Sequence, residues 1–130
     1  HNYVENLTFD VGAANPGATA LQFYSNNSGA VRECRFIAGD GSGAVGLDLG
    51  HRDMNGPLLV WKCEVVGFDY GITSARAVNS QTFETITLRG QSQVVMQVTG
   101  LVAAPASGAA WALWLTGADL TNMSSWPSGA

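Results

Sequence analysis

The chain has 130 residues, of which 46% are hydrophobic and only 12% are charged, and its formal net charge is −4 at pH 7. This length suits one domain, and the apolar content excludes a disordered chain. The negative charge and the single lysine, Lys62, argue against nucleic-acid binding, which needs clustered Lys and Arg. No apolar run approaches the roughly 20 residues of a membrane-spanning helix, so we expect no membrane span.

Four copies of one six-residue pattern follow each other along the chain, with apolar residues at the first, fourth and sixth positions. The copies are VENLTF from Val4, VRECRF from Val31, VWKCEV from Val60 and FETITL from Phe83. The i, i+2 spacing of the last two apolar positions is typical of a β-strand. The break between the first and fourth positions fits a two-residue corner, so each copy predicts two strands joined at a corner.

A second ladder of short strands lies between these copies. It consists of ALQF from Ala20, GLDL from Gly46, GITS from Gly71 and VMQV from Val95. The predicted inward column is Leu21, Leu47, Ile72 and Met96, and the predicted outward column is Gln22, Asp48, Thr73 and Gln97. Stretches rich in Gly, Asn, Ser and Pro separate the segments and predict loops.

Two interleaved ladders with one period of roughly 25 residues indicate a coil of short stacked strands. We therefore predict an all-β fold, a short parallel β-helix (a solenoid) of about four to five coils. An antiparallel sandwich also has short strands, but it does not explain like residues recurring at one period. We expect a single β-helix domain over residues 1–121 and an irregular tail over 122–130. A fifth copy is ambiguous, because two sets fit: Ala110/Leu113/Leu115 and Leu115/Ala118/Leu120.

The two cysteines, Cys34 and Cys63, hold the same position in successive copies, which predicts one inward column on adjacent coils. In-register parallel neighbours hold their Cβ atoms farther apart than the ~3.8 Å that a disulfide prefers. We therefore expect two free, buried thiols. A second inward column is predicted to stack Phe9, Phe36, Val65 and Leu88. With no C-x-x-C motif and no third thiol, no metal site is predicted, and no cofactor is expected.

Three stretches carry a resemblance to a known family: VENLTFDVGAANPGATALQFYSNNSGAVRECRF, GLDLGHRDMNGPLLVWKCEVVGFDYGI and NSQTFETITLRGQ. From about Val4 to Gly100 the chain resembles the pectate-lyase-like right-handed parallel β-helix superfamily, nearest its bacterial branch related to exo-β-1,3-glucanases and phage tail-spikes. The resemblance implies a right-handed helix, a polysaccharide ligand and an extracellular or cell-surface location.

The chain also departs from that family. The W-x-D-H and R-x-P-x-x-R motifs of its pectate lyases are absent. Complete enzymes of the family are several times longer, so we expect a partial or very short member. No catalytic residue is carried over.

One candidate site lies in the loop LDLGHRDMNG, which gathers Asp48, His51 and Asp53. Two carboxylates and an imidazole are capable of acid/base catalysis, and these three residues are the catalytic candidates. The alternative interpretation is a polar loop between two strands, in which Asp53 supplies turn chemistry.

A second candidate site is the outward column that contains Glu5, Arg32, Trp61 and Glu84. An outward Trp on a flat sheet stacks on a sugar ring, and neighbouring charged groups bind its hydroxyls. We therefore expect Arg32, Trp61 and Glu84 to bind ligand, unless Trp61 packs beneath a loop or a partner. The next column is expected to set Arg35 beside Glu64 as a cross-strand pair.

The function predicted is that of a carbohydrate-binding or carbohydrate-active module associated with polysaccharide degradation. Whether it is an enzyme stays open; if so, it is a polysaccharide hydrolase or lyase. The alternative is a non-catalytic structural or assembly module, such as a spike or filament segment. We also expect a homo-oligomer, because the strand edges near Tyr3 have no segment to cover them. The other end is expected to lie beneath three tryptophans, Trp111, Trp114 and Trp126.

Overall fold

The computed structural model describes residues 1–51, 56–75 and 81–99, and these residues contain twelve β-strands and no helix. The strands form three parallel sheets of four strands each. Sheet A contains β1 (Asn2–Glu5), β4 (Asn26–Arg32), β7 (Gly56–Trp61) and β10 (Gln81–Glu84). Sheet B contains β2 (Thr8–Asp10), β5 (Arg35–Ile37), β8 (Glu64–Val66) and β11 (Thr87–Arg89). Sheet C contains β3 (Thr19–Gln22), β6 (Val45–Asp48), β9 (Tyr70–Ala75) and β12 (Val94–Thr99).

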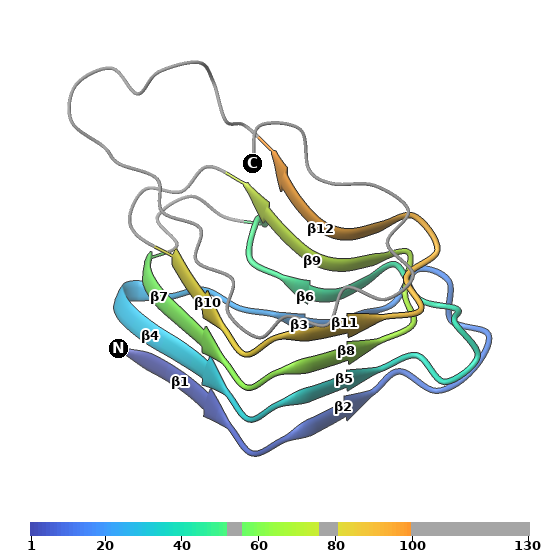
Figure 1. Cartoon of the computed structure of the whole chain (residues 1–130), viewed down its shortest axis with the longest axis horizontal. Helices are drawn as coiled ribbons and strands as arrows, with labels where there is room; N and C mark the ends of the chain where they lie inside the picture. Colours follow the sequence, from blue (N-terminus) through green and yellow to red (C-terminus); the bar gives the residue numbers. More distant parts are fainter. Residues whose placement is uncertain (52–55, 76–80, 100–130) are drawn as a thin grey trace.

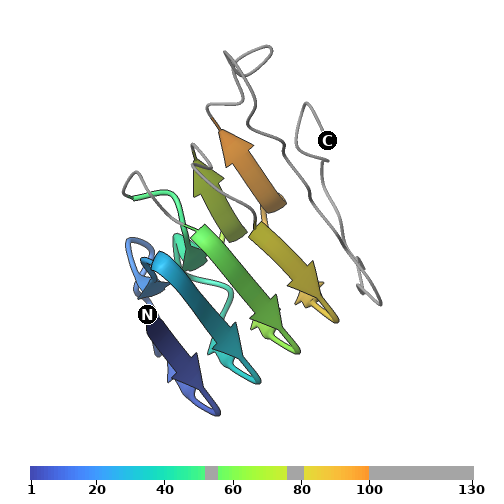
Figure 2. The same cartoon turned by 90° about the vertical axis from the view of Figure 1, so that its left-hand side faces the viewer.

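Each run of three consecutive strands, which we call a tier, gives one strand to each sheet. Tier 1 is β1–β3, tier 2 is β4–β6, tier 3 is β7–β9 and tier 4 is β10–β12. Figure 1 shows the four tiers stacked, and Figure 2 shows sheet A rising from blue β1 to yellow β10. The prediction of an all-β fold with stacked parallel strands is thus confirmed for the described residues.

The register of the sheets agrees with the predicted columns. Sheet A pairs Val4 with Val31, Val31 with Val60, and Val60 with Phe83. Sheet B aligns the predicted aromatic and aliphatic column, Phe9, Phe36, Val65 and Leu88. Sheet C aligns Leu21, Leu47, Ile72 and Met96. The recurring sequence pattern therefore predicts the pairing of all three sheets.

The core lies between the sheets and is formed by these inward columns. Val31, Phe36 and Leu47 of tier 2 are completely buried, and so are Val60 and Val65 of tier 3. The rings of Phe9 and Phe36 stack with their centroids 5.3 Å apart and an interplanar angle of 15°. Full burial of such a side chain contributes roughly 1.5–3 kcal/mol, so the columns are the main source of stability.

Sheets A and B meet at a two-residue corner in every tier, as the pattern predicts. The first residue of each corner adopts a left-handed conformation, with φ of 55°, 53°, 50° and 57° at Asn6, Glu33, Lys62 and Thr85. Inter-tier hydrogen bonds continue through the corner, since the N–H of Glu33 donates to Trp61 O at 2.8 Å and that of Lys62 to Glu84 O at 3.0 Å. The corner is therefore a regular, repeated element of the stack.

Tier 1 differs from the others in its exposure. Leu7 belongs to the same inward column as Cys34, yet it is 51% exposed while Cys34 is 2% exposed. Tyr3 is 56% exposed. β1, β2 and β3 are edge strands, with a neighbouring strand on one side only.

Several predictions fall outside the described residues. They include the domain end at residue 121, the tail 122–130, the fifth copy, and Trp111, Trp114 and Trp126. A separate finding concerns membranes: no helix among the described residues is long and apolar enough to cross one.

Candidate functional site

The two cysteines are members of the buried core. Cys34 and Cys63 are free and buried, which confirms the prediction of two free, buried thiols. The Cys63 thiol lies 3.5 Å from Val31 O and 3.4 Å from Trp61 O, to which it donates. Burial raises the pKa of Cys63 from 9.0 to about 11. Because the thiol stays protonated at neutral pH, it has little nucleophilic character there.

The catalytic candidate Asp48 is engaged in structural hydrogen bonds. Its carboxylate accepts hydrogen bonds from Gln22 Nε2 at 3.1 Å, Thr73 Oγ1 at 3.0 Å and Gly50 N at 2.9 Å. These bonds join three tiers on the outer face of sheet C. His51 is exposed, and Asp53 lies outside the described residues. No group of metal-ligating side chains is present in the described part of the chain.

The predicted ligand-binding residues do align on the outer face of sheet A. Arg32 is in register with Trp61, and Trp61 with Glu84. Arg32 forms an ion pair with Glu5, and its guanidinium lies 5.6 Å from the centroid of the Tyr3 ring. Trp61 is partly exposed and lies between two charged neighbours.

A shallow groove of about 390 Å³ runs along the corner next to this face. Residues of tiers 1, 2 and 3 line it: Asn6, Leu7, Thr8, Glu33, Cys34, Arg35, Lys62 and Glu64. Lys62 joins the groove to the sheet A face, because its Nζ lies 4.3 Å from the centroid of the Trp61 ring and 3.8 Å from Glu33 Oε1. The indole and the groove therefore form one continuous surface, which we call the outer corner.

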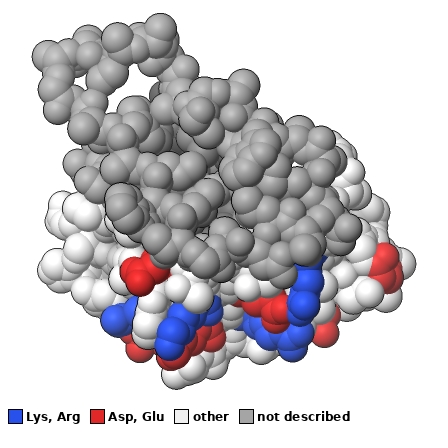
Figure 3. All heavy atoms as spheres, viewed as in Figure 1, with Lys and Arg blue, Asp and Glu red and all other residues white. Residues whose placement is uncertain are grey.

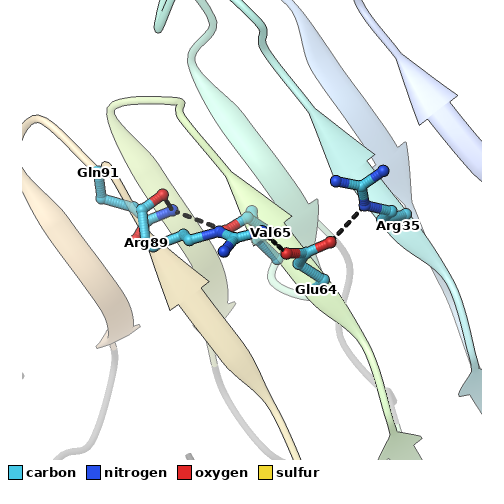
Figure 4. Close-up of polar contacts among 5 residues, drawn as sticks. All are labelled: Arg35, Glu64, Val65, Arg89 and Gln91. Carbon is cyan, nitrogen blue, oxygen red and sulfur yellow. Dashed lines mark hydrogen bonds and ion pairs between the residues drawn. The ribbon is translucent and has the colours of Figure 1, made fainter. Parts of the chain in front are cut away.

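Sheet B adds a chain of ion pairs to the outer corner. Glu64 binds Arg35 through one carboxylate oxygen and Arg89 through the other, as Figure 4 shows. The Arg35–Glu64 pair was predicted. Arg89 was not, since it lies diagonally from Glu64, opposite Val66. Beside this triad the buried Gln91 donates from Nε2 to Gly67 O at 2.9 Å and Arg89 O at 3.0 Å, which fixes the end of β11.

The charges of the outer corner balance. The outer corner and the sheet A and sheet B strands beside it hold all four cationic side chains of the described Lys and Arg residues, and four carboxylates interleave with them. The cations are Arg32, Arg35, Lys62 and Arg89, and the carboxylates are Glu5, Glu33, Glu64 and Glu84. In Figure 3 blue and red spheres lie side by side over the lower part of the face in view. The surface thus has many donors and acceptors but no excess charge.

Sequence reasoning did not predict the corner residues Asn6, Glu33 and Lys62 as site residues. The available signal was that each pattern copy has a polar residue directly after its outward position. No family model, curated protein or solved structure matches the chain. The chemistry of the outer corner is therefore the basis for assigning a function.

Proposed function

We propose that the chain is a short right-handed parallel β-helix of the pectate-lyase-like kind, and that its outer corner binds polysaccharide. The observation that carries the proposal is Trp61, a partly exposed indole in register between Arg32 and Glu84 on a flat parallel sheet. An aromatic face packs against the C–H face of a sugar ring, while flanking charged groups bind its hydroxyls.

The proposal is one of binding, without bond cleavage. Asp48 already accepts three hydrogen bonds within the protein, so its carboxylate is held as a structural group. A polysaccharide ligand agrees with an extracellular or cell-surface location, which is part of the same proposal.

Replacement of Trp61 tests the proposal. Isothermal titration of soluble β-glucans should give saturable binding to the wild type and none to Trp61→Ala. Thr73→Ala, on the outer face of sheet C, is the matched control and should bind like the wild type. Circular dichroism should show the same strand content in all three proteins. Equal binding by Trp61→Ala would remove Trp61 as the platform.

A second candidate function is a non-catalytic assembly module. The observation that favours it is the half-exposed Leu7, whose column mates in tiers 2 to 4 are buried. Under this alternative Leu7→Asp abolishes self-association, which sedimentation velocity detects as a loss of concentration dependence. A wild type that sediments as a monomer at micromolar concentration, and binds β-glucan, would contradict the assembly function.

A further inference from the structure

The groove at the outer corner follows the direction in which the tiers stack. Its lining includes the first corner residue of three successive tiers, Asn6, Glu33 and Lys62. Adjacent parallel strands are ~4.8 Å apart, so these equivalent positions recur at about that distance. This repeat is close to the length of one sugar residue in an extended β-linked glycan.

The corner backbone does not explain why these positions carry long side chains. All four corner residues adopt positive φ, a conformation that glycine reaches without steric cost and other residues reach with strain. Asn tolerates the left-handed region, but Glu33 and Lys62 have no such advantage, and Thr85 is β-branched. Glycine would turn the chain equally well. The positive φ recurs at Thr85 outside the groove and so belongs to the turn, whereas the side chains of Asn6, Glu33 and Lys62 belong to residues that also line the groove.

The charges of the groove select the class of ligand. Its two cations and two carboxylates are paired, Lys62 with Glu33 and Arg35 with Glu64. A charged chain finds no net attraction on such a surface. Hydroxyl groups, which donate and accept together, fit alternating cations and carboxylates well. The volume of about 390 Å³ lies within the ~300–1,000 Å³ range of small-molecule sites.

We infer that the row Asn6, Glu33 and Lys62 is a track for an extended, uncharged glycan, with one sugar residue against each of tiers 1 to 3. The inference rests on the proposed function, because Trp61 of tier 3 supplies the stacking platform next to Lys62. Asn6 and Glu33 extend the site beyond that platform, and they bind the hydroxyls of the second and third sugar residues.

The length of the ligand provides the first test. Cello-oligosaccharides of one to six glucose units are titrated into the wild-type protein by calorimetry. We expect the affinity to rise about five- to tenfold with each unit up to three, as one net hydrogen bond per sugar predicts, and then to level off. Oligogalacturonides of the same lengths, which carry one carboxylate per unit, should bind more weakly. An affinity independent of length overturns the track.

Glycine substitutions provide the second test, because they keep the turn and remove the side chain. Asn6→Gly and Glu33→Gly should each lower the affinity for cellotriose at least about fivefold, the equivalent of one lost hydrogen bond. Glu33→Gly should also raise the melting temperature, since the strain is relieved. Thr85→Gly is the matched control: the same turn in tier 4, outside the groove lining, should become more stable without a change in affinity.

The outcomes of these tests distinguish a failure of the track from a failure of the proposed function. If Asn6→Gly and Glu33→Gly bind cellotriose like the wild type while Trp61→Ala does not bind, the track is wrong and the platform stands. If Thr85→Gly weakens binding as much as Glu33→Gly, the effect belongs to the turn and the track is again wrong. If the wild type binds no glycan of any length, both are wrong.

Discussion

The inside and the outside of the stack follow different rules. Along an inward column the chemistry is nearly constant from tier to tier, as in Val4, Val31, Val60 and Phe83. Along the outward column next to it, a carboxylate, a guanidinium, an indole and a second carboxylate follow one another at Glu5, Arg32, Trp61 and Glu84. The two columns share the same strands and the same register.

The two columns differ because inward and outward side chains are subject to different physical constraints. An inward side chain must fill the same space in every tier, because interiors are close-packed. An outward side chain meets solvent and long, adaptable neighbours, so many residue types are tolerated at the same backbone position. The inside therefore specifies the fold, and the outside is free to differ from tier to tier and to carry function.

Two phenylalanines of one column provide the largest expected effect. Phe36→Ala should lower the free energy of unfolding by about 3–5 kcal/mol, the usual range for a buried Phe. Phe9→Ala should cost less than about 2 kcal/mol, because Phe9 in tier 1 is only partly buried and leaves a smaller cavity. Urea denaturation of both variants measures the two costs. Equal costs would mean that tier 1 is covered in solution, which favours the assembly function.

The buried Cys63 thiol makes the free energy of unfolding depend on pH. Its pKa is raised from 9.0 to about 11 by burial, so the folded protein holds the proton longer than the unfolded chain. The stability linked to this thiol is complete below pH 9 and falls by roughly 2–3 kcal/mol between pH 9 and 11. Denaturation under reducing conditions should show a steeper decline over this range for the wild type than for Cys63→Ala. Parallel pH profiles of the two proteins would contradict the shift.

The ion pairs of Glu64 provide the smallest expected effect on stability, since they lie on the outside. Glu64→Gln removes the partner of Arg35 and Arg89, whose side chains are both about half exposed. The cost should stay below about 1 kcal/mol and shrink in high salt, as for other exposed pairs. Urea denaturation at low and high salt measures it. A cost approaching that of Phe36→Ala would show that the triad supports the fold.

Much of the fold follows from the sequence because the inside repeats. The columns headed by Val4, Phe9 and Leu21 are visible as a pattern, and the pattern predicts the register of all three sheets. The exposure of Leu7 is not predictable in this way, because burial depends on a neighbouring tier and not on the local sequence. The left-handed conformation of Glu33 and Lys62 was also missed, since neither residue type favours it.

For the candidate site, the sequence predicts only which residues of neighbouring strands lie side by side. The sequence places Arg32 beside Trp61, because the register determines which backbone positions are neighbours. It does not predict that Lys62 extends over the Trp61 ring, or that Arg89 reaches Glu64 diagonally. Long side chains choose among several partners within reach, and the choice depends on packing that the pattern does not contain.

The most direct measurement is an NMR titration of isotope-labelled protein with cellotriose, which compares two outer surfaces in one experiment. Binding at the outer corner predicts chemical-shift changes at the amides of Asn6, Glu33 and Lys62 and at the Trp61 indole N–H. The hydrogen-bonded row of sheet C, Gln22, Asp48 and Thr73, should keep its shifts. Shift changes confined to that row, or no changes at all, would contradict a glycan site at the outer corner.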